Sequence, residues 1–269
     1  MKFTLLGASG FIGSHLLAHL EASGHECFAP ARDDATLFEQ ELGQVIYCIG
    51  LTADFRRRPF DTARAHVCFL AEVLEKADFA SLLYLSSTRV YAGSSSGDED
   101  ARLLAGDLYN LSKLTGEALC CAGGRDNVRV ARLSNVFGND FSSDNFLPAI
   151  IRTAVREGRV TLDTALDAAK DYVSIRDVVN ILPRIATQGK FGIYNVAGGR
   201  NTGNRELLAK LSEITGCSVD APDGAPATAF PPISIGRLER EFTYAPLAVL
   251  DCLEGLIAEY RQAFENKGK

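Results

Sequence analysis

A short apolar segment followed by three evenly spaced glycines constrains the fold of this chain more than any other feature. The segment KFTLLGA is typical of a strand, and Gly7, Gly10 and Gly13 lead from it into a helical pattern that Gly24 would end. Glycines at this spacing permit a tight turn, close approach of the backbone to a phosphate, and close packing of helix on strand. The N–H groups at the start of such a helix attract anions. The N-terminus therefore predicts a strand–turn–helix unit that binds a dinucleotide, although small residues also serve a purely structural turn.

Strand-like and helix-like segments alternate over roughly the first 140 residues. The β-rich runs HECFAPA, QVIYCIG, SLLYLSS and VRVARLS follow the first unit, and helical patterns cover residues 62–77 and 108–122. This alternation predicts an α/β chain with a doubly wound parallel sheet covered by helices on both faces. Only about a dozen residues separate the second strand from QVIYCIG, and a crossover helix needs about ten to twelve by itself. We therefore expect the outer strand of the first half to be missing, with the order 2-1-4-5-6 preserved.

Composition and charge argue against several classes of function. The chain has 269 residues, of which 46% are hydrophobic, and a formal net charge of -6, which disfavours nucleic acid and anionic membranes as partners. No apolar run approaches the ~20 residues of a membrane span. The 7 cysteines include no CxxC pair, and the N-terminus lacks the pattern of a signal peptide, so we expect a cytoplasmic protein. His15 and His19 are four residues apart, but no further ligand cluster accompanies them, so no metal site is expected.

Six further segments, in order along the chain, carry a resemblance to a known family. They are YLSSTRVYAG, YNLSKLTGE, RLSNVFG, KDYVSIRDVV, YNVAGG and IGRLEREFTYAP. Together with the glycine motif they resemble the extended branch of the short-chain dehydrogenase/reductase superfamily, the NAD-dependent epimerase/dehydratase family that acts largely on nucleotide sugars. The resemblance covers almost the whole chain. It implies a Rossmann-type fold, a nicotinamide cofactor, a small-molecule substrate, and a homodimer formed through the helices near 62–77 and 108–122.

The pattern loosens after about residue 140, which predicts two units. We expect residues 1–140 with 171–197 to form an NAD(P)-binding Rossmann domain. Residues 141–170 with 198–269 are expected to form a small lobe that encloses the substrate over the carboxyl ends of the strands. The lobe would include the helical pattern FLPAIIRTAVREG and a last amphipathic helix near 247–265.

The resemblance implies a catalytic set of Ser87, Tyr109 and Lys113, with Lys113 also gripping the nicotinamide ribose. The segment YNLSKLTGE matches the family pattern YxxSKxxxE, and residues four apart share a helix face. A free tyrosine has a pKa of about 10, and a nearby ammonium group would lower it so that Tyr109 can exchange a proton with a sugar hydroxyl or ketone. The cofactor contacts expected are Gly7, Ser9, Gly10, Phe11, Ile12, Gly13, Arg32, Tyr109 and Lys113. The substrate contacts expected are Ser87, Thr88, Asn135 and Lys170.

Two of these assignments have a structural alternative. Hydroxyls at a strand end such as Ser87 and Thr88 often bond only to the local backbone. Asn135 precedes Gly138 in RLSNVFG and is equally suited to forming a turn.

The chain departs from the family in the residues that follow the catalytic hydroxyl. Family dehydratases carry an Asp-Glu pair there, and this chain has Thr88 and Arg89, so we expect a 4-ketoreductase or 4-epimerase, the reductase slightly preferred, and no dehydratase activity. The arginine of the family's RDY segment is Lys170, and APATAFPP lacks an arginine that often holds the diphosphate. These changes weaken the nucleotide-diphosphate assignment. The segment FRRRPF at 55–60 either compensates or is a solvated loop.

The choice of cofactor depends on the end of the second strand. NAD-binding chains of this fold carry an acidic residue there, about 20 residues past the glycines. This chain has Ala31 and Arg32 instead, which favours NADP(H), with NAD(H) possible if Arg32 only faces solvent. Two alternatives stay open: a non-catalytic NAD(P)-binding sensor, and a reductase of a carbonyl substrate without a nucleotide.

Overall fold

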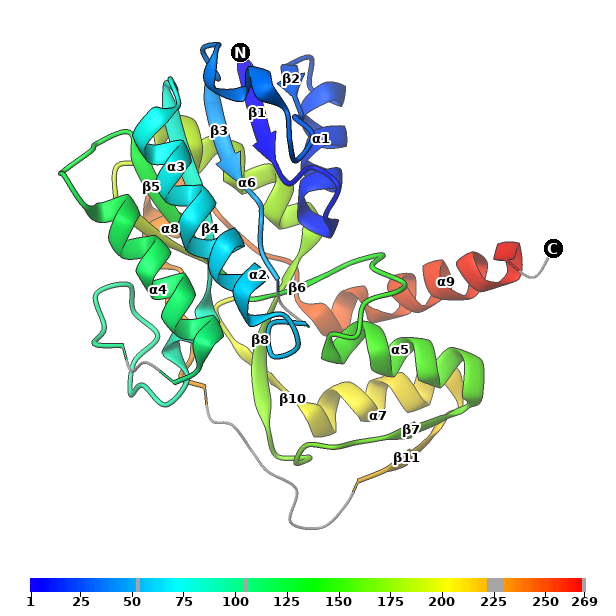
Figure 1. The fold of residues 1–269 in the computed structure, drawn as a ribbon. Helices are drawn as coiled ribbons and strands as arrows, with labels where there is room; N and C mark the ends of the chain where they lie inside the picture. Colours follow the sequence, from blue (N-terminus) through cyan, green and yellow to red (C-terminus); the bar gives the residue numbers. More distant parts are fainter. Residues whose placement is uncertain (52–53, 104–105, 222–229, 268–269) are drawn as a thin grey trace.

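A six-stranded parallel sheet forms the centre of the computed structural model, which describes residues 1–51, 54–103, 106–221 and 230–267 (Figure 1). Its strands are β1 (Lys2–Leu6), β2 (Glu26–Phe28), β3 (Gln44–Tyr47), β4 (Ser81–Ser87), β5 (Val128–Leu133) and β9 (Ile193–Val196). They are ordered β2-β1-β3-β4-β5-β9, and every neighbouring pair is parallel. The expected doubly wound parallel sheet is confirmed.

The first half of this sheet has two strands in the described chain. Residues 29–43, between β2 and β3, hold only the short helix η1 (Ala35–Phe38). Asp34 caps η1 by accepting a hydrogen bond of 2.9 Å from the Thr36 N–H. If the missing outer strand is given the number 3, the observed strands β2, β1, β3, β4 and β5 take the predicted order 2-1-4-5-6, and β9 follows as one further strand. The prediction of a missing strand is confirmed. The strand β2 is shorter than the segment HECFAPA suggested.

Helices cover both faces of the sheet because successive strand residues are apolar on opposite sides. On one face, α1 (Phe11–Ala22) and α6 (Ile175–Gln188) pack together over Leu5 and Ile46. On the other, α2 (Pro59–Ala63), α3 (Phe69–Lys76) and α4 (Leu108–Cys121) lie over Leu6 and Tyr47 (Figure 1). The helix expected at 62–77 is interrupted by a π-helical turn, η2 (Arg64–Cys68), between α2 and α3.

The second half of the chain builds smaller elements beside the main sheet. A three-stranded sheet in the order β10-β8-β6 joins β6 (Asn135–Phe137), β8 (Ala169–Ser174) and β10 (Asn201–Gly203). A separate core unites α5 (Phe146–Glu157), β7 (Arg159–Thr161), α7 (Asn204–Thr215), β11 (Ser218–Asp220) and α9 (Val249–Lys267). No described helix is both long enough and apolar enough to cross a membrane.

The helix α8 (Gly236–Phe242) packs on the main sheet rather than on the smaller core. Leu238 and Phe242 of α8 are buried in the same core as the residues of α1 and α6. The division into residues 1–140 with 171–197 and residues 141–170 with 198–269 stays a prediction.

A buried ion pair joins α4 to the middle of the main sheet. The Arg132 guanidinium on β5 donates to the Glu117 carboxylate on α4 at 2.6 Å, and the two side chains are 3% and 5% exposed. Glu117 also accepts a hydrogen bond of 2.5 Å from the Ser86 hydroxyl on β4, and Arg132 donates to the Tyr91 hydroxyl at 2.7 Å. Every charge in this network has hydrogen-bond partners, which is the condition for a buried pair to be tolerated.

Replacing one member of the pair is expected to destabilise the fold strongly. Glu117→Leu leaves the buried Arg132 guanidinium without its counter-charge, which should lower the free energy of unfolding by about 3–5 kcal/mol. Urea unfolding of the variant and wild type measures this difference.

The matched control is Glu72→Gln, because Glu72 forms an exposed pair with Lys76 at 2.9 Å on α3. That variant should change the free energy of unfolding far less than Glu117→Leu does. Equal effects of the two substitutions would show that the buried pair contributes nothing special to stability.

Candidate active site

The turn between β1 and α1 has the geometry of an anion cradle. Gly7 has φ of 92°, a conformation that favours glycine. A Cβ on Gly13 would lie 2.3 Å from the Gly7 carbonyl oxygen, so only glycine lets α1 approach the strand this closely. Gly10 is the N-cap of α1 and has no side chain that could accept a hydrogen bond. The N-cap residue therefore leaves the first N–H groups of the helix, at Phe11 and Ile12, without a side-chain acceptor. The residues present therefore fit a bound pyrophosphate.

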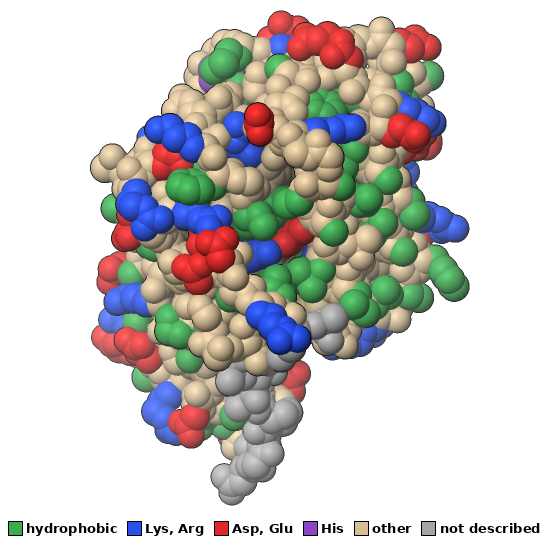
Figure 2. Space-filling model, turned by 90° about the vertical axis from the view of Figure 1, so that its left-hand side faces the viewer, with side chains coloured by type: hydrophobic (Ala, Val, Ile, Leu, Met, Phe, Trp, Pro, Cys, Tyr) green, Lys and Arg blue, Asp and Glu red, His purple; other side chains and the backbone are tan. Residues whose placement is uncertain are grey.

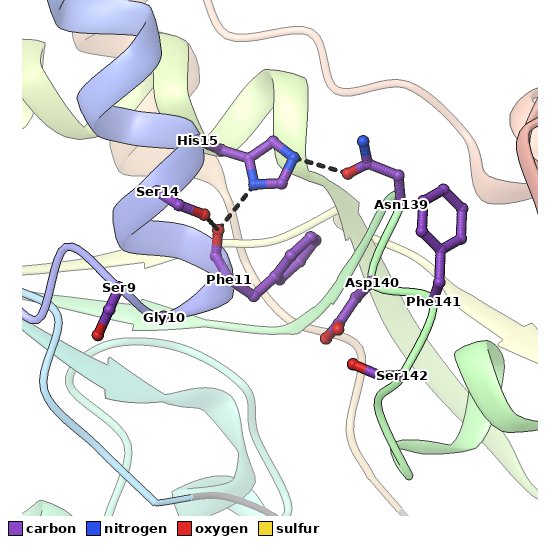
Figure 3. A pocket seen from close by; sticks show the side chains of 9 residues that line it. All are labelled: Ser9, Gly10, Phe11, Ser14, His15, Asn139, Asp140, Phe141 and Ser142. Atoms are coloured by element: carbon purple, nitrogen blue, oxygen red, sulfur yellow. Dashed lines mark hydrogen bonds between the residues drawn. The ribbon is translucent and has the colours of Figure 1, made fainter. Parts of the chain in front are cut away.

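A pocket of about 400 Å³ opens beside this cradle (Figure 3). It is lined by Ser9, Gly10, Phe11, Ser14, His15, Asn139, Asp140, Phe141 and Ser142. The predicted cofactor residues Ser9, Gly10 and Phe11 line one side, and the loop 139–142 after β6 forms the other side, which sequence reasoning missed. The loop begins close to two helices because residue 138 is glycine: a Cβ there would lie 2.6 Å from the Ile175 side chain of α6 and 3.1 Å from the Phe11 ring of α1.

His15 connects the two sides of the pocket. Its Nε2 lies 2.6 Å from the Asn139 side-chain oxygen and its Nδ1 lies 2.8 Å from the Phe11 carbonyl oxygen (Figure 3). His15 is thus engaged with the loop and with its own helix. Within the described ranges, no group of three His, Cys, Asp or Glu is arranged to hold a metal ion.

Ser87 and Tyr109 meet at the carboxyl end of the main sheet. Ser87 is the last residue of β4, and Tyr109 lies in the first turn of α4, where it is 5% exposed. The α4 helix begins there because the Asp107 side chain caps it by accepting from the Asn110 N–H at 3.1 Å. Ser87 accepts a hydrogen bond of 3.2 Å from the Arg89 N–H, and its hydroxyl is close enough to lower the pKa of Tyr109. Two residues distant in sequence are therefore brought together as expected.

The electrostatics of Tyr109 correct one expectation. Burial is the largest influence and raises the pKa of Tyr109 above its usual value, while Ser87 and the Arg89 guanidinium lower it. Lys113 does not act on Tyr109 in this way: its ammonium group donates to the Leu85 carbonyl oxygen at 2.8 Å. The Lys113 side chain therefore lies against β4. Burial lowers the pKa of Lys113 to about 7.

A buried histidine that sequence reasoning missed supports the same turn of α4. His66, in the π-helical turn, accepts from the Leu51 N–H at 3.2 Å through Nε2. Its Nδ1 lies 2.8 Å from the Ser112 hydroxyl, which donates to the Tyr109 carbonyl oxygen at 3.0 Å. The directions of these bonds place the proton on Nδ1. Burial, with the charge of Lys113, lowers the pKa of His66 to about 3, so the ring is neutral.

The structure places the predicted substrate residues in different surroundings. Thr88 is buried at 6% exposure. Asn135 is exposed on β6, and its side-chain nitrogen donates to the Asp171 carbonyl oxygen at 2.7 Å. The Lys170 ammonium lies 4.6 Å from the centre of the Phe146 ring, and burial, opposed by Asp163 and reinforced by Arg89, lowers its pKa.

Two further predicted features lie at the edges of the site. Arg32 is exposed in the loop that follows β2, beyond the carboxyl end of that strand. Most of the segment APATAFPP falls outside the described residues, because positions 222–229 are not among them.

The segment FRRRPF contains a buried aromatic residue beside Tyr109. Phe55 is 3% exposed, and its ring centre lies 5.5 Å from that of Tyr109. Arg56 is largely exposed, with its guanidinium 4.0 Å from Asp107 and 4.4 Å from the Phe55 ring centre. A phenylalanine beside three arginines gives no sequence signal for this contact.

Curated relatives of the chain are enzymes of nucleotide sugars. The chain is 28% identical over 244 residues to GDP-6-deoxy-D-mannose reductase of Pseudomonas aeruginosa, covering 79% of this chain and 80% of that enzyme. It is 28% identical over 200 residues to dTDP-glucose 4,6-dehydratase of Streptomyces griseus, covering 70% of this chain but only 60% of the relative. It is 22% identical to dTDP-4-dehydro-6-deoxy-D-allose reductase of a Streptomyces species, covering 95% and 94%. Because a dehydratase is among these relatives, the comparison does not support the exclusion of dehydratase chemistry.

Solved structures share the fold. MoeE5, solved with UDP-glucuronic acid and NAD, has a TM-score of 0.84 at 20% identity, covering 98% of this chain and 100% of that one. RMD of Pseudomonas aeruginosa, solved with NADPH, has a TM-score of 0.79 at 23% identity, covering 97% and 99%. The sequence pattern of the NAD dependent epimerase/dehydratase family matches residues 3–197. The chain therefore belongs to the NAD dependent epimerase/dehydratase family, as the order of its motifs indicated.

Proposed function

We propose that this protein is an NAD(P)-dependent ketoreductase of a sugar-like substrate, of the nucleotide-sugar class that the named relatives act on. The observation that carries the proposal is the meeting of Ser87 and Tyr109 at the carboxyl end of β4 and the start of α4. Substrates and cofactors of open α/β sheets bind at this edge of the strands. The glycine cradle at the start of α1 opens at the same edge.

The chain's own residues would place the substrate and move one proton. A nicotinamide bound on the cradle would supply the hydride. The Tyr109 hydroxyl would donate its proton to the carbonyl oxygen of the substrate, and the Ser87 hydroxyl would donate a hydrogen bond to the same oxygen. Lys113, beneath Tyr109, would hold the nicotinamide ribose. Thr88, Asn135 and Lys170 would contact the substrate.

Reduction is favoured over water elimination by the residues that follow Ser87. Thr88 offers a buried hydroxyl and Arg89 a guanidinium, and neither can serve as the carboxyl acid and base that elimination uses. The Asp107 carboxylate is paired with the Arg89 guanidinium at 2.6 Å. An epimerase would need the same Ser, Tyr and Lys, and the expected use of a released NADP(H) favours the reductase.

A homodimer remains a proposal from the family resemblance. Figure 2 views the molecule from the side on which α4 lies in Figure 1, and exposed apolar side chains lie there among charged ones. On α4, Leu108 is 38% and Leu111 48% exposed. Light scattering at micromolar concentration should give twice the chain mass, and a monomer would count against this proposal.

Removing the Tyr109 hydroxyl should abolish turnover and leave cofactor binding intact. Tyr109→Phe keeps the ring packing but removes the proton that reduction needs, so the rate should fall about 10²–10⁴-fold. The assay is NADPH oxidation over a panel of nucleotide-activated and free keto-sugars, which also separates the nucleotide-dependent from the nucleotide-free alternative. Thermal stabilisation by NADPH measures binding in the same variant.

Tyr194→Phe is the matched control, because its hydroxyl donates to Glu241 at 2.6 Å and serves the fold away from the site. A Tyr109→Phe variant that keeps more than about a tenth of the wild-type rate would exclude Tyr109 as the acid. If NADPH stabilises the wild type but no keto-sugar is reduced, the result would support a non-catalytic NAD(P)-binding sensor and reject the proposed reductase activity.

Arg32 is proposed to set a preference for NADP(H). The exposed guanidinium beyond β2 can bind a 2′-phosphate through two charged hydrogen bonds, so Arg32→Ala should weaken NADPH binding about tenfold or more and leave NADH binding unchanged. Titration of both cofactors against wild type and variant measures the ratio. Arg205→Ala, an exposed arginine paired with Asp167 on the small lobe, is the control. Equal affinity of the wild type for NADH and NADPH would contradict the assignment.

A further inference from the structure

Arg89 is held over the phenol ring of Tyr109 by contacts from three segments. Its guanidinium donates to Asp107, the N-cap of α4, at 2.6 Å, and both side chains are about one-third exposed. The guanidinium carbon lies 5.4 Å from the centre of the Tyr109 ring and 5.1 Å from that of Phe55. The Arg89 N–H donates to the Ser87 hydroxyl oxygen at 3.2 Å. The position of this cation is therefore fixed by the backbone, by a carboxylate and by an aromatic ring.

The other cation near Tyr109 is directed elsewhere. The Lys113 ammonium donates to the Leu85 carbonyl oxygen at 2.8 Å and lies 4.8 Å from the centre of the Tyr84 ring. Burial lowers the pKa of Lys113 to about 7. A guanidinium stays charged at every pH at which the fold exists.

We propose that Arg89 is a positioning residue that acts through Tyr109, supplying the positive charge that stabilises the tyrosine's deprotonated form. The proposal rests on the assignment of Tyr109 as the proton-transfer group. A carboxylate at position 89 would instead repel the same phenolate. The reaction written above leaves Tyr109 without its proton, so a fixed cation beside it stabilises the group at the moment of transfer.

The groups around Tyr109 raise or lower its pKa in different directions. Burial raises the pKa of Tyr109, Ser87 and Arg89 lower it, and Asp107 raises it. His66 packs edge to face on the Tyr109 ring at 5.5 Å and is neutral, since burial and Lys113 lower its pKa.

Groups one step further away act on Arg89 or on α4 itself. Burial is the main cause of the lowered pKa of Lys170, and the charge of Arg89 lowers it further, against the effect of Asp163. Arg56 lies 4.0 Å from Asp107 with a largely exposed side chain, and the buried Tyr84 hydroxyl donates to the His66 carbonyl oxygen at 3.3 Å. Loss of the Arg89 charge therefore leaves burial and Asp107 to raise the pKa of Tyr109 further.

The test is the titration of Tyr109 itself in protein saturated with NADP⁺ and, separately, with NAD⁺. Tyrosinate absorbance is followed with pH, and the curve of a Tyr109→Phe partner variant is subtracted so that Tyr109 alone is observed. In Arg89→Gln the midpoint should rise by about one pH unit relative to wild type. Arg89→Lys, which keeps the charge, should recover part of the shift. Arg56→Gln, which removes the other cation on Asp107, should leave the midpoint in place.

Two outcomes overturn the inference. The first is a Tyr109 titration midpoint in Arg89→Gln that equals the wild-type midpoint. The second is a midpoint in Arg56→Gln that rises as much as in Arg89→Gln, which would indicate that any nearby positive charge has the same effect on Tyr109. Where a keto-sugar is turned over, the pH profile of kcat/KM should move with the titration. A shifted titration without turnover of any keto-sugar supports the Arg89–Tyr109 coupling and rejects the proposed reductase. Turnover of a keto-sugar with an unshifted titration supports the proposed reductase and rejects the Arg89–Tyr109 coupling.

Discussion

The buried ion pair between Glu117 and Arg132 fixes the arrangement on which the site depends. It joins α4 to β5, and the Ser86 hydroxyl extends the network to β4. The same strand ends one residue later at Ser87, and the same helix carries Tyr109 two turns before Glu117. This charged network holds the strand and the helix together, and the hydroxyls of Ser87 and Tyr109 meet at their ends. A buried ion pair is tolerated only when its charges are fully hydrogen-bonded, and this pair lies between the strand and the helix that carry the site.

Much of the fold follows from local patterns. The strands of the main sheet lie in largely apolar segments, which predicted the parallel sheet. Only about a dozen residues separate the segments HECFAPA and QVIYCIG, which is too few for a further strand with its helix, so the missing strand could be predicted as well. The strands β6, β7, β10 and β11 are three residues each, too short to show a periodicity. The π-helical turn at His66 gives no separate pattern, because its residues continue the apolar spacing of a helix.

The site residues whose places follow from the sheet could be predicted from the sequence. Those whose contacts depend on the direction of a side chain could not. Ser87 and Tyr109 meet because a strand end and the start of the next helix share one edge. Lys113 was expected beside the phenol, but an i, i+4 spacing fixes only the helix face, and the long side chain turned to Leu85. Phe55 and the loop 139–142 reach the site through contacts over long stretches of chain, which no local pattern reveals.

The central claim is that this protein reduces a sugar ketone by net transfer of hydride from a nicotinamide. The most direct measurement uses NADPH labelled with deuterium at the transferable position of C4 and follows the label by mass spectrometry and NMR. The account predicts one deuterium on the former carbonyl carbon for each cofactor oxidised, and loss of this transfer in Tyr109→Phe. A product that has lost water, or has inverted a hydroxyl, without net oxidation of the cofactor would contradict it.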